Sequence, residues 1–247
     1  IQRRYFRNLA RTVLPDDIEY FALLVPSKDL MKSFDSLILR QKSVFKYVQW
    51  AFGEPFNSEC FLLFFGREPI IDFKELFEKL DSRSGTLAIF GTQKHLLKFF
   101  SFMEQKNLKT DLEKNGVVVT GGGSGKEVSG DQFRKKASRY LGVSPNYHID
   151  FYGSTESMLQ LANKPGSENP DKKMVPAQGF VYVADEDIFL EKGEIQPVEN
   201  GTEGLAVVID ALNPDYPGAI LTDDIVRKTG GEYGEDVRVE YIRRASK

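Results

Sequence analysis

Residues 117–126, VVVTGGGSGK, and residues 151–157, FYGSTES, decide how the rest of the chain is interpreted. In each stretch a short apolar run of the kind that forms a buried strand leads directly into a turn containing glycine. The segment between them, Asp131 to Leu141, has helical character. We therefore expect two strand ends with exposed backbone at one edge of a sheet, where open α/β sheets bind their ligands.

Strands and helices are predicted to alternate over the first two thirds of the chain. Buried strands are predicted at Tyr20–Val25, Cys60–Phe65, Thr86–Phe90, Val117–Val119 and His148–Phe151. Helices are predicted at 31–52, at 73–80 with Asp72 as N-cap, at 92–106 with Thr92 as N-cap, and at 131–141. Such an alternation is typical of βαβ units and a mainly parallel sheet.

The character of the sequence changes near Asn163. Residues 164–176 are polar and loop-like, and short runs rich in Val, Ile and Phe follow. These runs predict strands at 180–184, 187–190, 204–212, 219–223 and 237–242. The predicted fold is thus α/β: a mainly parallel sheet with flanking helices over residues 1–162, followed by a smaller antiparallel curled sheet or barrel over residues 163–247.

Charge and cysteine content exclude several classes of function. The 247 residues carry a net charge of −3 and no polybasic run, which argues against binding to nucleic acid or to a membrane surface. No apolar run approaches the ~20 residues of a membrane-spanning helix. Cys60 is the single cysteine and cannot form an internal disulfide, so we expect a cytoplasmic protein and a buried, structural Cys60.

The glycine-rich stretch after Val119 first suggests a phosphate-binding loop, because backbone N–H groups at a helix start attract anions. Its spacing does not match Gly-x4-Gly-Lys-Ser/Thr, and Glu127 stands where the magnesium-binding hydroxyl is required. It does not match a dinucleotide fingerprint either, because Lys126 takes the place of the third glycine. Two interpretations remain: an ordinary strand-to-helix turn, or a backbone edge that lies flat against a planar ligand.

The second loop carries more chemistry. Tyr152 offers a planar face, and Gly153 permits close approach to a ligand. Ser154 and Thr155 offer hydroxyls to phosphate oxygens, and Glu156 offers a carboxylate to a magnesium ion. These groups together suit a nucleotide with a metal. The alternative is a strand end with an ordinary capping box.

Tyr152-Gly153-Ser154-Thr155-Glu156 resembles the Tyr-Gly-x-Thr-Glu motif of the adenylate-forming superfamily, whose members join carboxylates to AMP. The wider run from Gly121 to Ser157 resembles the acyl-protein synthetases, the long-chain fatty acid–protein ligases of bacterial bioluminescence. Phenylacetate–CoA ligases are the neighbouring branch. The resemblance implies that the chain forms part of an adenylate-forming large domain and uses ATP and Mg²⁺.

Two later segments fit the same pattern. Residues 220–225, ILTDDI, resemble the Thr-Gly-Asp-Leu motif and imply that Asp224 binds the ribose hydroxyls. Asp223 replaces the usual glycine, which leaves a shift of the role by one residue open. Residues 241–244, YIRR, resemble the Leu-Gly-Arg hinge and imply that Arg244 binds ribose, with Arg243 replacing the glycine.

The resemblance defines a candidate site residue by residue. Thr155, on the α-phosphate, and Glu156, on magnesium, are the implied catalytic residues, and Glu156 is the implied metal ligand. The implied nucleotide-binding residues are Gly121, Gly122, Gly123, Tyr152, Gly153, Ser154, Asp224 and Arg244.

The implied activity is the ATP-dependent conversion of a carboxylic acid, a fatty acid in the closest branch, into acyl-AMP, followed by transfer to a thiol. The implied partners are a fatty or aryl acid, a thiol acceptor (a protein cysteine or CoA) and a partner reductase. The upstream phosphate loop and the C-terminal lysine domain of the family have no counterpart in these residues. The alternatives are a non-catalytic nucleotide-binding or partner-docking module and a sugar-nucleotide enzyme with another base-binding loop.

Two further features leave alternatives open. His148 precedes the Tyr-Gly strand end, where it faces either the carboxylate substrate or the protein core. Several phenylalanines, among them Phe99, Phe100 and Phe102, line either an apolar acyl channel or the core. Aromatic residues in such segments are most often core.

Overall fold

The computed structural model divides into two compact units. The boundary along the chain falls between Ile149 and Asp150, inside strand β5 (His148–Tyr152). The sequence places its change of character slightly later, near Asn163. The structure describes residues 13–15, 18–26, 59–65, 69–82, 85–112, 116–121, 128–153, 159–176, 179–211, 218–231 and 237–245. The helix predicted at 31–52 lies outside the described residues.

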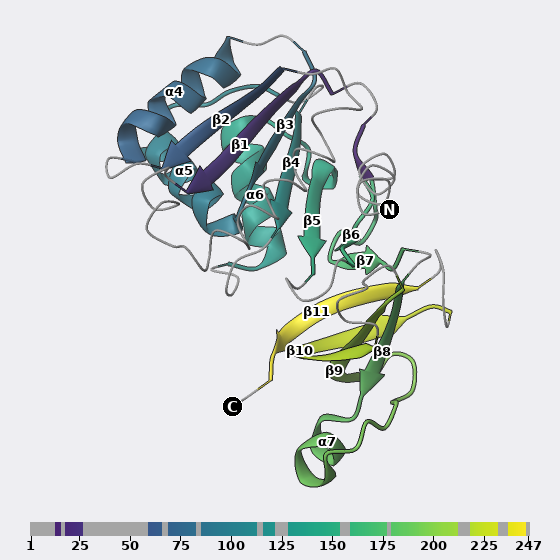
Figure 1. Ribbon diagram of the computed structural model, residues 1–247. Helices are drawn as coiled ribbons and strands as arrows, with labels where there is room; N and C mark the ends of the chain where they lie inside the picture. The colour runs from purple at the N-terminus through teal and green to yellow at the C-terminus, as the bar shows by residue number, and fades with distance from the viewer. Residues whose placement is uncertain are drawn as a thin grey trace. The chain divides into compact units, whose positions relative to one another are not determined.

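The first unit contains a parallel sheet with the strand order β2-β1-β3-β4 (Figure 1). Its strands are β1 (Tyr20–Pro26), β2 (Glu59–Phe65), β3 (Leu87–Gly91) and β4 (Gly116–Gly121). All three neighbouring pairs run parallel. The predicted parallel sheet is confirmed, and each of these strands lies within two residues of its predicted bounds.

Three described helices follow strands β2, β3 and β4 in turn: α4 (Pro69–Asp81), α5 (Gln93–Gln105) and α6 (Gly130–Leu141). The predicted cap at Thr92 is confirmed, because its hydroxyl accepts a hydrogen bond from the His95 N–H at 3.3 Å. The predicted cap at Asp72 is wrong, since α4 already begins at Pro69. Proline is favoured in the first turn because its missing N–H has no partner there in any helix.

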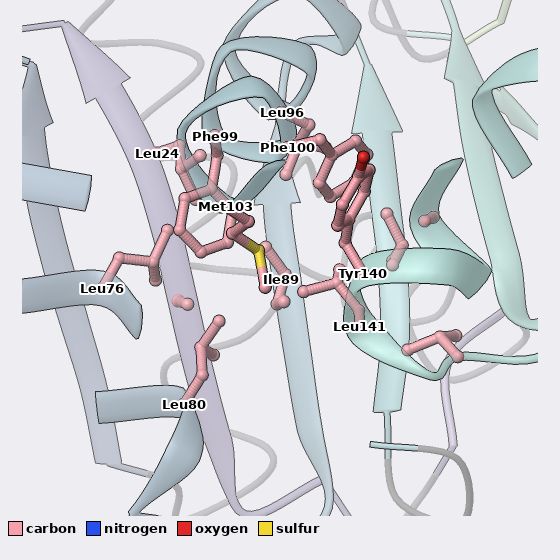
Figure 2. Close-up of a cluster of buried hydrophobic side chains, with 14 of the residues drawn as sticks. Leu24, Leu76, Leu80, Ile89, Leu96, Phe99, Phe100, Met103, Tyr140 and Leu141 are labelled. Atoms are coloured by element: carbon pink, nitrogen blue, oxygen red, sulfur yellow. The ribbon is translucent and has the colours of Figure 1, made fainter. Parts of the chain in front are cut away.

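The core of the first unit lies between the sheet and these three helices. Ala22, Ile89 and Val118 are register partners on three neighbouring strands and share one face of the sheet. Buried residues of all three helices complete the cluster, drawn in part in Figure 2: Phe73, Leu76, Leu80, Leu96, Phe99, Phe100, Phe102, Met103, Phe133, Ala137, Tyr140 and Leu141. Of the two interpretations of Phe99, Phe100 and Phe102, the core interpretation is the one that the structure supports.

The second unit is an antiparallel sheet. Its strands are β6 (Leu161–Ala162), β7 (Lys172–Met174), β8 (Gly179–Ala184), β9 (Glu203–Asp210), β10 (Ala219–Thr229) and β11 (Arg238–Arg244). From the end of β5 the order is β6-β7-β11-β10-β9-β8. Within the described residues this order is open, so the predicted antiparallel sheet is confirmed and the alternative of a closed barrel is not.

Two predictions in the second unit are wrong. The strand predicted at 187–190 is a helix, α7 (Glu186–Lys192), which the side chain of Asp185 caps by accepting from the Ile188 N–H at 2.9 Å. Gly193 ends this helix in the left-handed conformation, with φ 69°. The predicted loop at 164–176 contains a short strand, β7. No helix in the described part of the chain is long and apolar enough to cross a membrane.

Candidate nucleotide site

Five of the predicted site residues lie within the described structure. Gly121 ends β4 in the first unit. In the second unit Tyr152 ends β5 and Gly153 follows it, exposed, while Asp224 lies in β10 and Arg244 ends β11. The other five, Gly122, Gly123, Ser154, Thr155 and Glu156, lie outside the described residues, so their roles stay predictions.

Tyr152 and Asp224 are in direct contact although 72 residues separate them in sequence. The Tyr152 hydroxyl donates a hydrogen bond to Oδ2 of Asp224 at 2.7 Å. Burial of the ring, followed by the nearby Asp224 carboxylate, raises the pKa of Tyr152 above its usual value. Tyr152 therefore remains a hydrogen-bond donor at physiological pH, and the structure brings Asp224 rather than Asp223 to it.

An irregularity in β10 explains the position of Asp224. The pairing of β10 with β9 is interrupted between Leu221 and Ile225. The Thr222 hydroxyl compensates, because it donates to the Ala206 carbonyl at 3.1 Å and accepts from the Asp224 N–H at 3.2 Å. Such interruptions bend a strand and redirect its side chains, and they are common next to binding sites.

Arg244 lies beside two carboxylates. Asp224 and Arg244 are register partners on β10 and β11, and Nε of Arg244 is 3.7 Å from Oδ1 of Asp224. Nη1 of Arg244 is 3.5 Å from Oδ2 of Asp223. Arg244 and Asp223 are both exposed, so this pair contributes little to stability. The exposed guanidinium of Arg244 is instead available to contact a ligand.

Tyr241 is a member of this cluster that the sequence analysis missed. Its ring centroid lies 5.9 Å from that of Tyr152, with an interplanar angle of 40°. Burial and the Asp224 carboxylate raise the pKa of Tyr241 as well. Tyr241 stands in the quoted hinge segment, but nothing in that segment indicates that its ring faces Tyr152. Tyr241 is the register partner of Val226 on β10, next to the shift in register between Ile225 and Val226.

The raised pKa of Tyr152 predicts a specific dependence of stability on pH. Above pH 10, the ordinary pKa of tyrosine, Tyr152 loses its phenolic proton in the unfolded chain but keeps it in the folded state. The folded state then binds more protons, so stability falls as pH rises above 10. We expect Tyr152→Phe to reduce this alkaline loss, measured as urea midpoints at pH 8 and above pH 10. Tyr147→Phe, at an exposed tyrosine, is the control, and equal losses in both variants would contradict the prediction.

In the first unit, His148 contacts Thr120, the residue that precedes Gly121. His148 is 4% exposed, and its Nε2 is 2.8 Å from the Thr120 hydroxyl. The imidazole also packs against Phe133, with ring centroids 4.9 Å apart. The structure therefore supports the packing interpretation of His148, as a contact that holds the end of β4 where the glycine loop begins.

The donors and acceptors of the second-unit cluster fit a ribose. Carboxylate oxygens accept hydrogen bonds only, and each has room for more than one. Asp224 can therefore accept from ribose hydroxyls while it still accepts from Tyr152. For the metal there is no comparable support, because no group of three or more His, Cys, Asp or Glu side chains in the described structure is arranged to hold an ion. Magnesium on Glu156 stays a prediction.

Comparison with solved structures identifies the fold as that of adenylate-forming ligases. The chain is similar to a long-chain-fatty-acid-CoA ligase (FadD1) from Archaeoglobus fulgidus, with 13% identity, a TM-score of 0.63, and coverage of 99% of this chain and 47% of that one. It is also similar to ATP-bound MatB from Rhodopseudomonas palustris, with 13% identity, a TM-score of 0.62, and coverage of 98% and 42%. A third relative is a 2-hydroxyisobutyryl-CoA ligase in complex with 2-HIB-AMP and CoA, with 16% identity, a TM-score of 0.64, and coverage of 98% and 49%.

The chain belongs to the acyl-protein synthetase family, LuxE, whose model matches residues 44–247. This confirms the resemblance that the motifs indicated. No curated protein sequence matches the chain. The chain spans about half the length of the solved structures that it resembles.

Proposed function

We propose that this chain contributes the nucleotide site of a ligase that activates a carboxylic acid with ATP and passes the acyl group to a thiol. The observation that carries the proposal is the contact of Tyr152 with Asp224, with Arg244 alongside. Three residues expected at one nucleotide site, from three distant segments, meet in one cluster. Membership in the acyl-protein synthetase family supports the same reaction class.

The proposed reaction has two steps. A carboxylate oxygen attacks the α-phosphorus of ATP, the bond from that phosphorus to the bridging oxygen breaks, and acyl-AMP and pyrophosphate form. A thiolate then attacks the acyl carbon and AMP leaves. Positioning and stabilisation of the developing charge are the main contributions that a protein makes to phosphorus chemistry of this kind.

Within this scheme the described residues hold the nucleoside. Asp224 accepts hydrogen bonds from the ribose hydroxyls, and Tyr152 keeps that carboxylate in place. Arg244 binds the ribose from the opposite strand. We assign adenine to the loop Gly121–Gly123 and the α-phosphate to Thr155, and bound Mg²⁺ on Glu156 would neutralise charge on the phosphates.

We further propose a fatty acid as the substrate and a protein cysteine as the acceptor, as the resemblance to fatty acid–protein ligases implies; the family name itself gives an acyl group and a protein. An aryl acid and CoA are the alternatives from the neighbouring branch. A partner reductase that consumes the acyl group, and a cytoplasmic location consistent with the single Cys60, belong to the same proposal.

The ribose contact can be tested with Asp224→Asn. The amide keeps the shape of the side chain but loses the charge that strengthens its hydrogen bonds. We expect AMP to bind about tenfold to a hundredfold more weakly, the usual worth of a hydrogen bond to a charged group. Isothermal titration calorimetry measures this. The matched control is Asp187→Asn, at an exposed position on α7, and equal effects of the two changes would contradict the role of Asp224.

The first step, formation of acyl-AMP, can be tested by ATP–pyrophosphate exchange in the full-length protein, with fatty and aryl acids offered separately. Exchange that depends on a fatty acid is the expected result. Binding of AMP without exchange for any acid would favour the non-catalytic nucleotide-binding module. Failure to bind both AMP and a non-hydrolysable acyl-adenylate would overturn the proposal.

A further inference from the structure

Lys173 is a buried cation to which the proposed function gives no role. It lies in β7 and is 1% exposed, which makes it one of the largest fully buried side chains described. A buried ammonium is strongly destabilising unless it is paired. Its Nζ lies 2.9 Å from Oδ2 of Asp150 and donates to the Asp171 carbonyl at 3.4 Å.

The backbone of Asp150 makes a second contact, with Asn163. Its N–H donates to Oδ1 of Asn163 at 2.7 Å, and Asn163 is fully buried. Phe151 pairs with Ala162, and Ala162 pairs with Met174. Because both pairs of strands run antiparallel, Asp150 lies opposite Asn163, and Asn163 lies opposite Lys173. Asp150, Asn163 and Lys173 therefore form one polar row across three strands. The Lys173 side chain bridges two strand spacings, about 9–10 Å, to reach Asp150.

This row connects the strands that carry the two tyrosines. The backbone of Lys173 is in register with Val239, two residues before Tyr241 on β11. On the other side, Asp150 precedes Tyr152 by two residues, and side chains two apart on a strand share a face. The ion pair between Lys173 and Asp150 thus ties the end of β5 to β7, while the β7–β11 ladder ties β7 to the strand with Tyr241 and Arg244.

On its β6 side, little backbone pairing holds the end of β5. β5 and β6 pair over two residues, and β6 and β7 over one. A buried ion pair adds little net stability compared with apolar residues of the same size, but it demands a defined geometry. Such a pair is suited to fixing where β5 ends relative to its neighbours.

We propose that Lys173 is a positioning residue of the nucleotide site, which acts through Asp150 to hold Tyr152 against Asp224. The inference rests on the proposed function for its consequence in nucleotide binding. Its structural part, the placement of Tyr152, concerns the protein without ligand. The two parts can therefore be tested separately.

The first test is Lys173→Met in the full-length protein. Methionine has a similar length but removes the ammonium that pairs with the Asp150 carboxylate. We expect AMP to bind about tenfold more weakly, because residues of one polar network are energetically coupled. We also expect the ¹³Cζ resonance of Tyr152, assigned with Tyr152→Phe, to move in the ligand-free protein. Lys164→Met, at an exposed lysine, is the matched control and is expected to change neither.

The double variant Asp150→Asn/Lys173→Met separates positioning from stability. It removes both charges, so stability is expected to return toward that of the unmodified protein. If the pair positions Tyr152, AMP binding remains weak in spite of this recovery. Unchanged AMP affinity in the double variant, or an unshifted Tyr152 resonance in Lys173→Met, would overturn the proposal. If the unmodified protein does not bind AMP, the proposed function fails and the Tyr152 resonance alone decides the role of Lys173.

Discussion

Replacement of Glu156 by alanine is expected to abolish ATP–pyrophosphate exchange that depends on a carboxylic acid. In the proposed function Glu156 would hold a magnesium ion, which would neutralise charge on the phosphates of ATP. Without that charge, negative charge on the phosphates opposes the attack of a carboxylate on the α-phosphorus. Removing a single preorganised charge-stabilising group typically costs about a hundredfold to a thousandfold in rate, which places exchange near or below detection.

The controls for this prediction exclude loss of folding. AMP binding, which we assign mainly to Tyr152, Asp224 and Arg244, is expected to persist in Glu156→Ala. Glu156→Gln tests the charge itself and is expected to lose exchange as well, whereas Glu168→Ala, at an exposed site in the same part of the chain, is expected to retain it. Unaltered exchange in Glu156→Ala would refute the assignment of the motif.

Phe100→Ala is expected to destabilise the first unit by about 3–5 kcal/mol, the usual range for a buried phenylalanine. Phe100 is 1% exposed. Its ring centroid lies 5.7 Å from that of Phe133 and 5.9 Å from that of Tyr140, with a stacked arrangement for the latter. The substitution removes these contacts and leaves a cavity that the surrounding helices can fill only in part. Domains have only about 5–15 kcal/mol of stability in total.

Urea unfolding followed by circular dichroism measures this effect. Lys98→Ala, at an exposed position of the same helix, is the control and is expected to change the midpoint little. Phe100→Leu is expected to lose much less than Phe100→Ala, since it retains most of the volume. A urea midpoint for Phe100→Ala equal to that for Lys98→Ala would contradict the packing of Phe100 against Phe133 and Tyr140. Phe133 also packs against His148, whose Nε2 contacts the Thr120 hydroxyl before the glycine loop.

Local signals explain why the described strands of the first unit, and its helices α5 and α6, were predicted well. Its strands are continuous apolar runs with glycine or proline at their ends, as expected when both faces of a parallel sheet are buried. Ser129 and Gln132 form a capping box at the start of α6, and Gly142 ends that helix with φ 70°. Each of these features depends on neighbouring residues alone, so periodicity and capping suffice to place the element.

The errors arise where local signals are ambiguous or where tertiary contacts override them. Residues Ile188–Leu190 are a short apolar run, which periodicity cannot assign to a strand or a helix. The cap at Asp185 and the left-handed Gly193 decide for a helix. Lys172–Met174 has no strand pattern, yet it forms β7, where Lys173 is buried and pairs with the Asp150 carboxylate on β5.

The sequence by itself determined the parallel sheet, the family and the expectation that Tyr152, Asp224 and Arg244 serve one nucleotide, because motif order and apolar periodicity are written in neighbouring residues. Only the tertiary structure decided that Tyr152 donates to Asp224, that Tyr241 faces Tyr152, and that Lys173 is buried against Asp150. Those contacts depend on the register between strands far apart in the chain. That register is fixed by the pairing of the whole sheet and by the irregularities in β10, which no single segment of sequence reveals.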